Sequence, residues 1–213
     1  MDKETKDYID QKIDKSKTIL NSGTVPSGFA GDTESEPDPF ANWRDKDIYP
    51  VWKDETGSHT IENLDGIHVP VIDGTEILVY PEYEECKFLP KSNAIQWTVA
   101  SQGHPLYRDI DQHAATDELL ELGSKAAGHV RKYDKDMPLP IQLLAIARYQ
   151  KRINDVSKIL HGDTLSFRPY ELWSCLREIA DYVWCVDKSN GTFSSLVLHD
   201  IGLSVPVSLV KRH

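Results

Sequence analysis

The chain has 213 residues and a formal net charge of −10; 39% of its residues are hydrophobic and 27% are charged. This length is sufficient for one domain with its own core, or for a smaller domain that carries an arm. The longest apolar runs, such as Ile77 to Tyr80, are far shorter than the roughly 20 residues of a membrane-spanning helix, and the negative charge disfavours binding to nucleic acid or to an anionic membrane.

Two segments precede the rest of the chain. Residues 1–20 alternate acids with lysines and predict a charged helix, although its apolar stripe of Ile9, Ile13 and Leu20 is thin for a packed face. Residues 21–47 are rich in Gly, Pro, Ser and acids and have no period of 2 or 3.6 residues. This composition predicts a flexible acidic linker.

A β-hairpin is the clearest local pattern. Two β-rich runs, IHVPVI and TEILVY, flank Asp73-Gly74, a dipeptide that favours the positive φ angles of a type I′ turn, and so predict a hairpin over residues 67–80. Because Pro70 cannot donate to a ladder, the first strand is expected at a sheet edge. Alternating apolar residues over 94–100 predict a third strand.

Helical spacing begins after residue 110. Apolar residues at steps of three and four, with Thr116 as an N-cap, predict a first helix that reaches Tyr133, and a second amphipathic helix is predicted from Ile141 to Leu160. A third helix is predicted to begin near Pro169, a residue suited to a first turn. Its expected apolar stripe consists of Leu172, Trp173, Leu176, Ile179, Ala180 and Val183. The later runs LVL and VPVSLV predict short strands or an extended tail.

These elements predict an α+β protein. An N-terminal helix and a flexible acidic arm precede a folded domain over residues 48–213. Within that domain, residues 60–100 are expected to form a central β-hairpin or small antiparallel sheet, and residues 110–187 are expected to be mainly helical, with about three helices.

The negative charge is concentrated in one part of the chain. Residues 32–90 hold fifteen acids and four bases, whereas residues 1–31 and 91–213 are each close to neutral. A segment of this charge favours a basic protein partner. Phe40 and Trp43 are aromatic residues in the acidic linker and are predicted to contact that partner.

The cysteines and the N-terminus indicate a cytoplasmic protein. Cys86, Cys175 and Cys185 form an odd set without metal-like spacing, as is typical of reduced thiols. Cys175 and Cys185 lie in or beside the Trp-rich third predicted helix, where a thiol is usually a small buried hydrophobe. The N-terminus lacks the apolar core of a secretory signal, so no export is expected.

No motif predicts a catalytic, cofactor-binding or metal-ligating residue. HExxH, CxxC, GxSxG and a glycine-rich phosphate loop are all missing from the sequence. His113 and Asp117, near Asp109 and Asp111, would share a helix face and could hold a divalent ion, but a metal site needs three or four ligands. A polar helix start is the preferred interpretation, although an active site assembled from residues far apart in sequence stays open.

Basic residues gather on the second predicted helix. Arg148, Lys151, Arg152 and Lys158 lie on its polar side, and the segment before it carries Arg131, Lys132 and Lys135. A solvated helix face is the preferred interpretation, because the surrounding region is nearly neutral. The alternative is a patch, formed chiefly by Arg148, Lys151 and Arg152, that contacts RNA or an acidic peptide.

Two positions in the acidic arm have the spacing that acidophilic kinases recognise. Thr33 has Glu36 three residues further on, and Ser35 has Asp38. The string DTESEP, together with the order of helix, acidic arm, small central module and helical C-terminal module, resembles rhabdovirus phosphoproteins, which tether a viral polymerase to its nucleocapsid. The resemblance implies that Thr33 and Ser35 are phosphoacceptors; residues 60–213 show no alignment with that family.

The favoured function is therefore that of a non-enzymatic adaptor, whose acidic N-terminal arm binds a basic protein. The alternatives are a polymerase cofactor similar to the viral phosphoproteins, and an enzyme or nucleic-acid-binding protein with an unrecognised site in the C-terminal half. A pocket with several convergent titratable groups would favour an enzyme. No cofactor is expected, and an oligomer is possible.

Overall fold

The computed structural model describes residues 47–54, 59–90, 93, 105, 110–161, 171–179, 181–187 and 192–210. All of them belong to one compact unit, residues 39–213. The predicted helix over residues 1–20, the linker up to residue 46 and the predicted strand over 94–100 lie outside the described residues.

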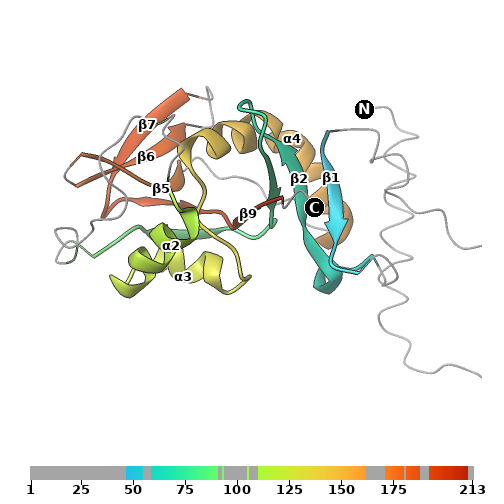
Figure 1. Cartoon of the computed structure of the whole chain (residues 1–213), viewed down its shortest axis with the longest axis horizontal. Coiled ribbons are helices and arrows are strands. Elements are labelled where there is room, and N and C mark those ends of the chain that lie inside the picture. Colours follow the sequence, from blue (N-terminus) through green and yellow to red (C-terminus); the bar gives the residue numbers. More distant parts are fainter. Residues whose placement is uncertain are drawn as a thin grey trace, which may run out of the picture. The chain divides into compact units, whose positions relative to one another are not determined.

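The described part of the chain contains three α-helices and two β-sheets (Figure 1). The helices are α2 (Gln112–Glu121), α3 (Lys125–Arg131) and α4 (Pro140–His161), and a short 3₁₀ helix spans Ile61–Asn63. The first sheet has the order β1-β2-β3-β9, formed by Tyr49–Trp52, Leu64–Pro70, Glu76–Val79 and Val207–Leu209. The second has the order β4-β8-β5-β6-β7, formed by Glu84–Lys87, Ile201–Ser204, Leu172–Ile179, Tyr182–Asp187 and Thr192–Val197.

The predicted hairpin is confirmed, with a different turn. β2 and β3 pair antiparallel, with Ile67 opposite Val79. The Gly74 N–H donates to the Val71 carbonyl oxygen, and Gly74 alone in this turn has a positive φ, +82°. A type I′ turn needs two positive φ angles, so this loop is instead a turn followed by a left-handed glycine, the arrangement of a G1 bulge. The expectation that β2 lies at an edge is wrong, because β1 pairs with its other side.

One bent two-stranded ladder joins the two sheets. β3 pairs with β9 in the first sheet, and the same two stretches of chain pair again as β4 and β8 in the second. At the bend, the Tyr80 N–H donates to the Pro206 carbonyl oxygen at 3.0 Å. Pro206 has no N–H to offer a ladder, which suits it to the position where the strands change sheet.

The first predicted helix is divided in two. Gly123 has a φ of +82°, and the Ser124 N–H donates to the Leu119 carbonyl oxygen, which closes α2 as in a Schellman motif. The Ser124 hydroxyl then accepts from the Ala127 N–H and caps α3. Asp111 caps α2, so the predicted N-cap at Thr116 is wrong.

The second predicted helix is confirmed as α4. Pro140 begins it, which suits the missing N–H of proline, and it ends at His161. Its first half is covered almost completely, as shown by the buried side chains of Ile141, Leu143 and Ile146. α4 contacts strands of both sheets, β2 in one and β5 and β6 in the other (Figure 1).

The third predicted helix is wrong, and with it the mainly helical C-terminal half. Residues that were expected to form its stripe belong to β5 and β6, which pair antiparallel, and the chain then continues through β7, β8 and β9. The consecutive residues Leu172 to Leu176 are all buried. A strand that is buried on both faces is apolar at nearly every position, so it also has apolar residues at helical spacing.

Trp173 in β5 has its side chain in the core, in contact with β4 and β8. Its side chain is fully buried, its ring packs against Phe88 at a centroid distance of 5.1 Å, and its Nε1–H donates to the Cys86 carbonyl oxygen at 3.1 Å. Gly202 in β8 faces the ring so closely that a Cβ atom there would lie 2.6 Å from Trp173 Cε2. The close approach of β8 to Trp173 therefore requires glycine.

Candidate functional site

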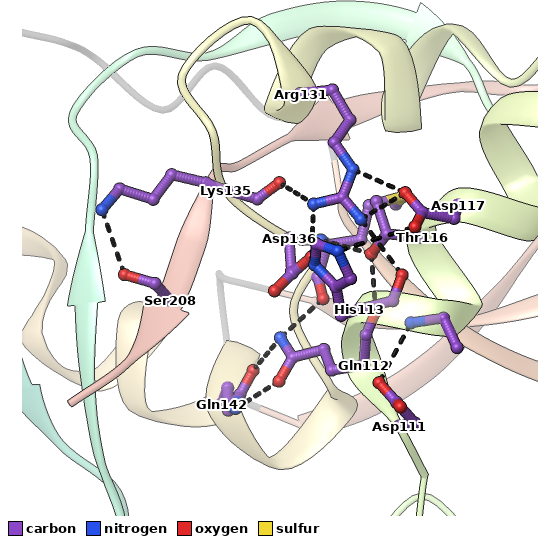
Figure 2. Close-up of polar contacts among 12 residues, drawn as sticks. Asp111, Gln112, His113, Thr116, Asp117, Arg131, Lys135, Asp136, Gln142 and Ser208 are labelled. Carbon is purple, nitrogen blue, oxygen red and sulfur yellow. Dashed lines mark hydrogen bonds and ion pairs between the residues drawn. The ribbon is translucent and has the colours of Figure 1, made fainter. Parts of the chain in front are cut away.

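Arg131, the last residue of α3, is the centre of a polar cluster (Figure 2). Its Nε and Nη2 atoms donate to Asp117 Oδ1 in α2, at 3.0 and 2.6 Å, and its Nη1 atom donates to Asp136 Oδ1 at 2.6 Å. Nη1 also donates to the Lys135 carbonyl oxygen at 2.9 Å, and Nη2 donates to the His113 carbonyl oxygen at 3.1 Å. Three segments of the chain thus meet at one guanidinium.

These contacts use the whole hydrogen-bonding capacity of Arg131. A guanidinium has five N–H groups, and each of them has an acceptor among the contacts just described. The side chain is only 15% exposed. The phosphate-binding alternative for Arg131 therefore receives no support, since the residue has no donor left for a ligand.

The polar start of α2 is part of the same cluster. His113 Nδ1 lies 3.0 Å from Asp136 Oδ1, and His113 Nε2 lies 3.6 Å from Asp117 Oδ2. The two carboxylates that flank the imidazole also receive the Arg131 guanidinium. Among the described residues, no three His, Cys, Asp or Glu side chains converge as metal ligands. Asp109 lies outside the described residues.

Buried amides continue the cluster toward α4 (Figure 2). Gln112 Nε2 donates to the Met137 carbonyl oxygen at 2.7 Å and to Gln142 Oε1 at 2.9 Å. Gln142 Oε1 also accepts the Leu139 N–H, and the Thr116 hydroxyl accepts the Met137 N–H. Because buried polar groups cost free energy unless they are paired, this network fixes residues 135–139 between the helices.

A pocket of about 340 Å³ lies beside Arg131. It is lined by Lys53, Leu64, Asp65, Tyr80, Arg131, Lys132, Tyr133, Asp134 and Lys135. These residues come from the end of β1, the start of β2, the bend after β3 and the C-terminal end of α3. The pocket therefore brings together several titratable groups beside the first sheet, which is the feature expected of an enzyme, but Arg131, Lys132 and Lys135 are held in ion pairs with carboxylates.

The floor of the pocket is held by Lys135. Its ammonium donates to Asp65 Oδ1 in β2 at 2.7 Å and to the Ser208 hydroxyl in β9 at 3.1 Å. Lys135 is 8% exposed, which fits a charge that is paired and hydrogen-bonded on burial. The Asp136 N–H and C=O also pair with Val207, so the segment after α3 is tied to the edge of the first sheet.

Two tyrosines form one wall of the pocket. The rings of Tyr80 and Tyr133 stack with centroids 4.6 Å apart and an interplanar angle of 29°. Burial raises the pKa of both hydroxyls, and for Tyr80 the neighbouring Tyr133 adds to the shift. Both side chains therefore remain neutral phenols near neutral pH.

Near Tyr133, the side chain of Glu84 in β4 forms ion pairs with residues at the C-terminal end of α3. Lys132 Nζ donates to Glu84 Oε2 at 3.0 Å, and His129 Nδ1 lies 3.1 Å from the same oxygen. The hydrogen bond from Lys132, helped by the charges of Lys132 and His129, lowers the pKa of Glu84, while desolvation opposes the shift. Folding thus favours the ionised form of Glu84.

Neutralising Glu84 is expected to weaken the dependence of the free energy of unfolding on pH at acid pH. A carboxyl whose pKa is lowered on folding stabilises the protein above its unfolded pKa, about 4.3, and loses that contribution as the pH falls through the folded value. We expect the urea midpoint of the wild-type protein to fall more steeply than that of Glu84→Gln between about pH 5 and pH 3. Glu121→Gln on α2 is the control for loss of one exposed carboxylate; equal slopes for wild type and Glu84→Gln would contradict the ion pair.

The exposed stripe of α4 is limited to its second half. Arg148, Lys151 and Lys158 are exposed, whereas Arg152 is half-buried. No ion pair joins the three exposed cations to a carboxylate of the described residues, and Arg148 packs over the Tyr149 ring at 5.7 Å. The predicted patch is therefore reduced to three exposed cations, next to the exposed Ile159.

The cysteines are buried free thiols. Cys86, Cys175 and Cys185 form no disulfide. Desolvation raises the pKa of each, to about 12 for Cys86 and Cys175. The prediction that Cys175 and Cys185 are small buried hydrophobes is confirmed, because both side chains are fully buried. A thiol that burial keeps protonated is not an activated nucleophile.

Sequence reasoning did not find the pocket. Its walls come from residues far apart in the chain: Lys135 bonds to Asp65, 70 residues away, and to Ser208, 73 residues away. The predicted partner-binding residues Phe40 and Trp43 lie outside the described residues.

The predicted phosphoacceptors Thr33 and Ser35 also lie outside the described residues. Comparison with family profiles, with curated proteins and with solved structures finds no match to this chain. No helix that the structure describes is long and apolar enough to cross a bilayer.

Proposed function

We propose that the protein is a non-enzymatic adaptor that binds other proteins through surfaces of opposite charge. The observation that carries this proposal is the separation of negative and positive charge along the chain. Residues 32–90 hold fifteen acids against four bases, while the exposed cations of α4 have no carboxylate partner among the described residues. Separated charges of this kind steer encounters with partners of the opposite sign.

The acidic arm is the surface proposed for a basic partner. Glu34, Glu36 and Asp38 supply its charge, and Phe40 and Trp43 supply apolar anchors of the type that carries most binding free energy. Phosphorylation of Thr33 or Ser35 would add to the negative charge and strengthen the same attraction. The literal string match to rhabdovirus phosphoproteins lies in this arm, and the helical C-terminal module on which the resemblance also rested is not found, because the described residues after α4 lie mainly in strands.

The exposed stripe of α4 supports a second candidate, which is binding to RNA or to an acidic peptide. Arg148, Lys151 and Lys158 lie on one face. Three cations are few compared with the six to ten phosphate contacts typical of strong nucleic-acid binders, and Asp155 lies among them. The magnitude of this charge therefore favours the adaptor.

Reversing the charge of the arm is expected to slow association. A partner is first retained on the immobilised full-length chain and identified by mass spectrometry, and its binding is then measured by stopped flow. We expect Glu34→Lys, Glu36→Lys and Asp38→Lys together to lower the association rate about tenfold or more at low salt, with a smaller change in dissociation.

The matched control reverses three acids on the described surface, Glu121, Asp181 and Asp200. It alters the net charge by the same amount, so only a local role of the arm predicts different rates for the two triple variants. Equal association rates and equal salt slopes would show that the arm is a solubilising spacer.

A further inference from the structure

Most charged side chains that line the pocket beside Tyr80 are neutralised by ion pairs within the protein. Three of the four cations that line it are paired with carboxylates, in the ion pairs Arg131–Asp117, Arg131–Asp136, Lys132–Glu84 and Lys135–Asp65. Ion pairs within the protein therefore account for most of its charge, and a ligand would meet the groups that these pairs leave over.

Lys53, Tyr80 and Tyr133 keep hydrogen-bond donors outside the ion pairs, in addition to the N–H groups that Lys132 and Lys135 do not use in theirs. The Lys53 ammonium donates to the Glu62 carbonyl oxygen at 3.2 Å and forms no ion pair with a carboxylate of the described residues. An ammonium has three N–H groups, so two remain. The hydroxyls of Tyr80 and Tyr133 make no hydrogen bond to the residues that the structure describes, and both rings face the pocket.

The acceptors of the pocket are fewer. The Asp65 carboxylate is already held by Lys135, and Asp134 is exposed on the turn after α3. Asp134 has a φ of +55°, in the left-handed region that ends helices. The turn after α3 therefore accounts for the backbone conformation of this residue. The groups of the pocket that stand outside the ion pairs are thus the Lys53 ammonium and two phenol hydroxyls as donors, with the exposed Asp134 carboxylate as an acceptor.

We propose that this pocket binds a small organic oxyanion, a carboxylate or a phosphate carried on a flat or apolar group. Two phenol donors and one ammonium without an ion pair among the described residues, all in one pocket lining, match the lone pairs and charge of such an anion. The stacked rings of Tyr80 and Tyr133, with Leu64, offer a flat apolar wall to the organic part. A volume of about 340 Å³ lies at the lower end of the range for ligand pockets, which selects a small molecule.

The test uses the full-length chain and four probes of similar size. Benzoate and phenyl phosphate represent the two sources of an oxyanion, benzyl alcohol is the neutral probe and benzylammonium is the cationic one. Binding is followed by ¹H–¹⁵N chemical shifts of the Tyr80, Tyr133 and Lys53 amides during titration. One or both anions are expected to saturate these shifts, and the tighter of the two identifies carboxylate or phosphate as the preferred group.

Two variants test the assigned donors. Lys53→Gln is expected to raise the Kd of the preferred anion about tenfold, because it removes a charge-assisted bond, and Tyr133→Phe is expected to raise it about threefold. Lys125→Gln and Tyr182→Phe are the matched controls, since both residues are exposed and neither lines the pocket. Lys53 is itself exposed, so its replacement leaves the core intact.

Several outcomes would overturn the proposal. They are benzylammonium or benzyl alcohol binding as tightly as the anions, no saturable shift with either anion at millimolar concentration, or a Kd that Lys53→Gln leaves unchanged. Preference for the cation would instead assign the pocket to Asp134 and the two aromatic faces.

Discussion

Replacing Trp173 with alanine is expected to lower the free energy of unfolding by about 3–5 kcal/mol, the range for loss of a large aromatic side chain from a packed core. The indole is fully buried in β5, packs against Phe88 and donates to the Cys86 carbonyl oxygen in β4. Its removal leaves a cavity and takes one hydrogen bond from the Cys86 carbonyl oxygen. Urea denaturation followed by far-UV circular dichroism measures the change.

Trp184→Ala is the matched control for Trp173→Ala. Trp184 lies in β6, is half-buried and meets Phe193 edge to face at 6.3 Å, so its loss is expected to cost clearly less. Gly202→Ala approaches the same indole from β8 and should destabilise the protein through overpacking. A cost below about 1 kcal/mol for Trp173→Ala would mean that β5 is not a central strand.

Replacing Arg131 with methionine is expected to cost about 3 kcal/mol. Removing one partner of a buried ion pair typically costs about 3–5 kcal/mol, because the remaining charge stays uncompensated. The lower value is expected here, since the Asp117 side chain is 50% exposed and can be hydrated, whereas that of Asp136 is only 20% exposed. The measurement is again the urea midpoint at constant slope.

Two further variants separate charge from geometry at this position. Arg131→Lys keeps the charge but cannot supply five donors in a planar fork, so it should recover only part of the loss. Arg148→Met on the exposed side of α4 removes an arginine that forms no ion pair with the residues that the structure describes, and it should change stability by less than about 0.5 kcal/mol. If Arg131→Met matched Arg148→Met, the cluster would not hold α2 and α3 together.

The elements that sequence predicted correctly are those with local signals. The hairpin has two β-rich runs and a turn glycine within a few residues, and α4 has Pro140 at its start and a long amphipathic stripe. The break between α2 and α3 also had a local signal, since Gly123 and Ser124 are the residues that end one helix and cap the next.

β5 and the pocket lacked such signals. Burial on both faces of β5 removes the alternation that identifies a strand. An intrinsic strand preference is found only in the next strand, β6, in the β-branched and aromatic residues of YVWCVD. The Arg131 cluster and the pocket depend on contacts between distant segments, for which a single sequence holds no periodicity. The types of the residues were visible, but their pairing was not.

Because of the bent ladder, both sheets need β8 and β9 to be complete. β8 lies between β4 and β5 inside the second sheet, and β9 completes the first sheet next to β3. Both sheets therefore lack a strand while residues 201–210 are still inside the ribosome. Contacts this distant in sequence are slow to form, so the emerging chain has incomplete sheets until residues 201–210 are available, and exposed strand edges of this kind leave a new chain open to chaperones and to aggregation.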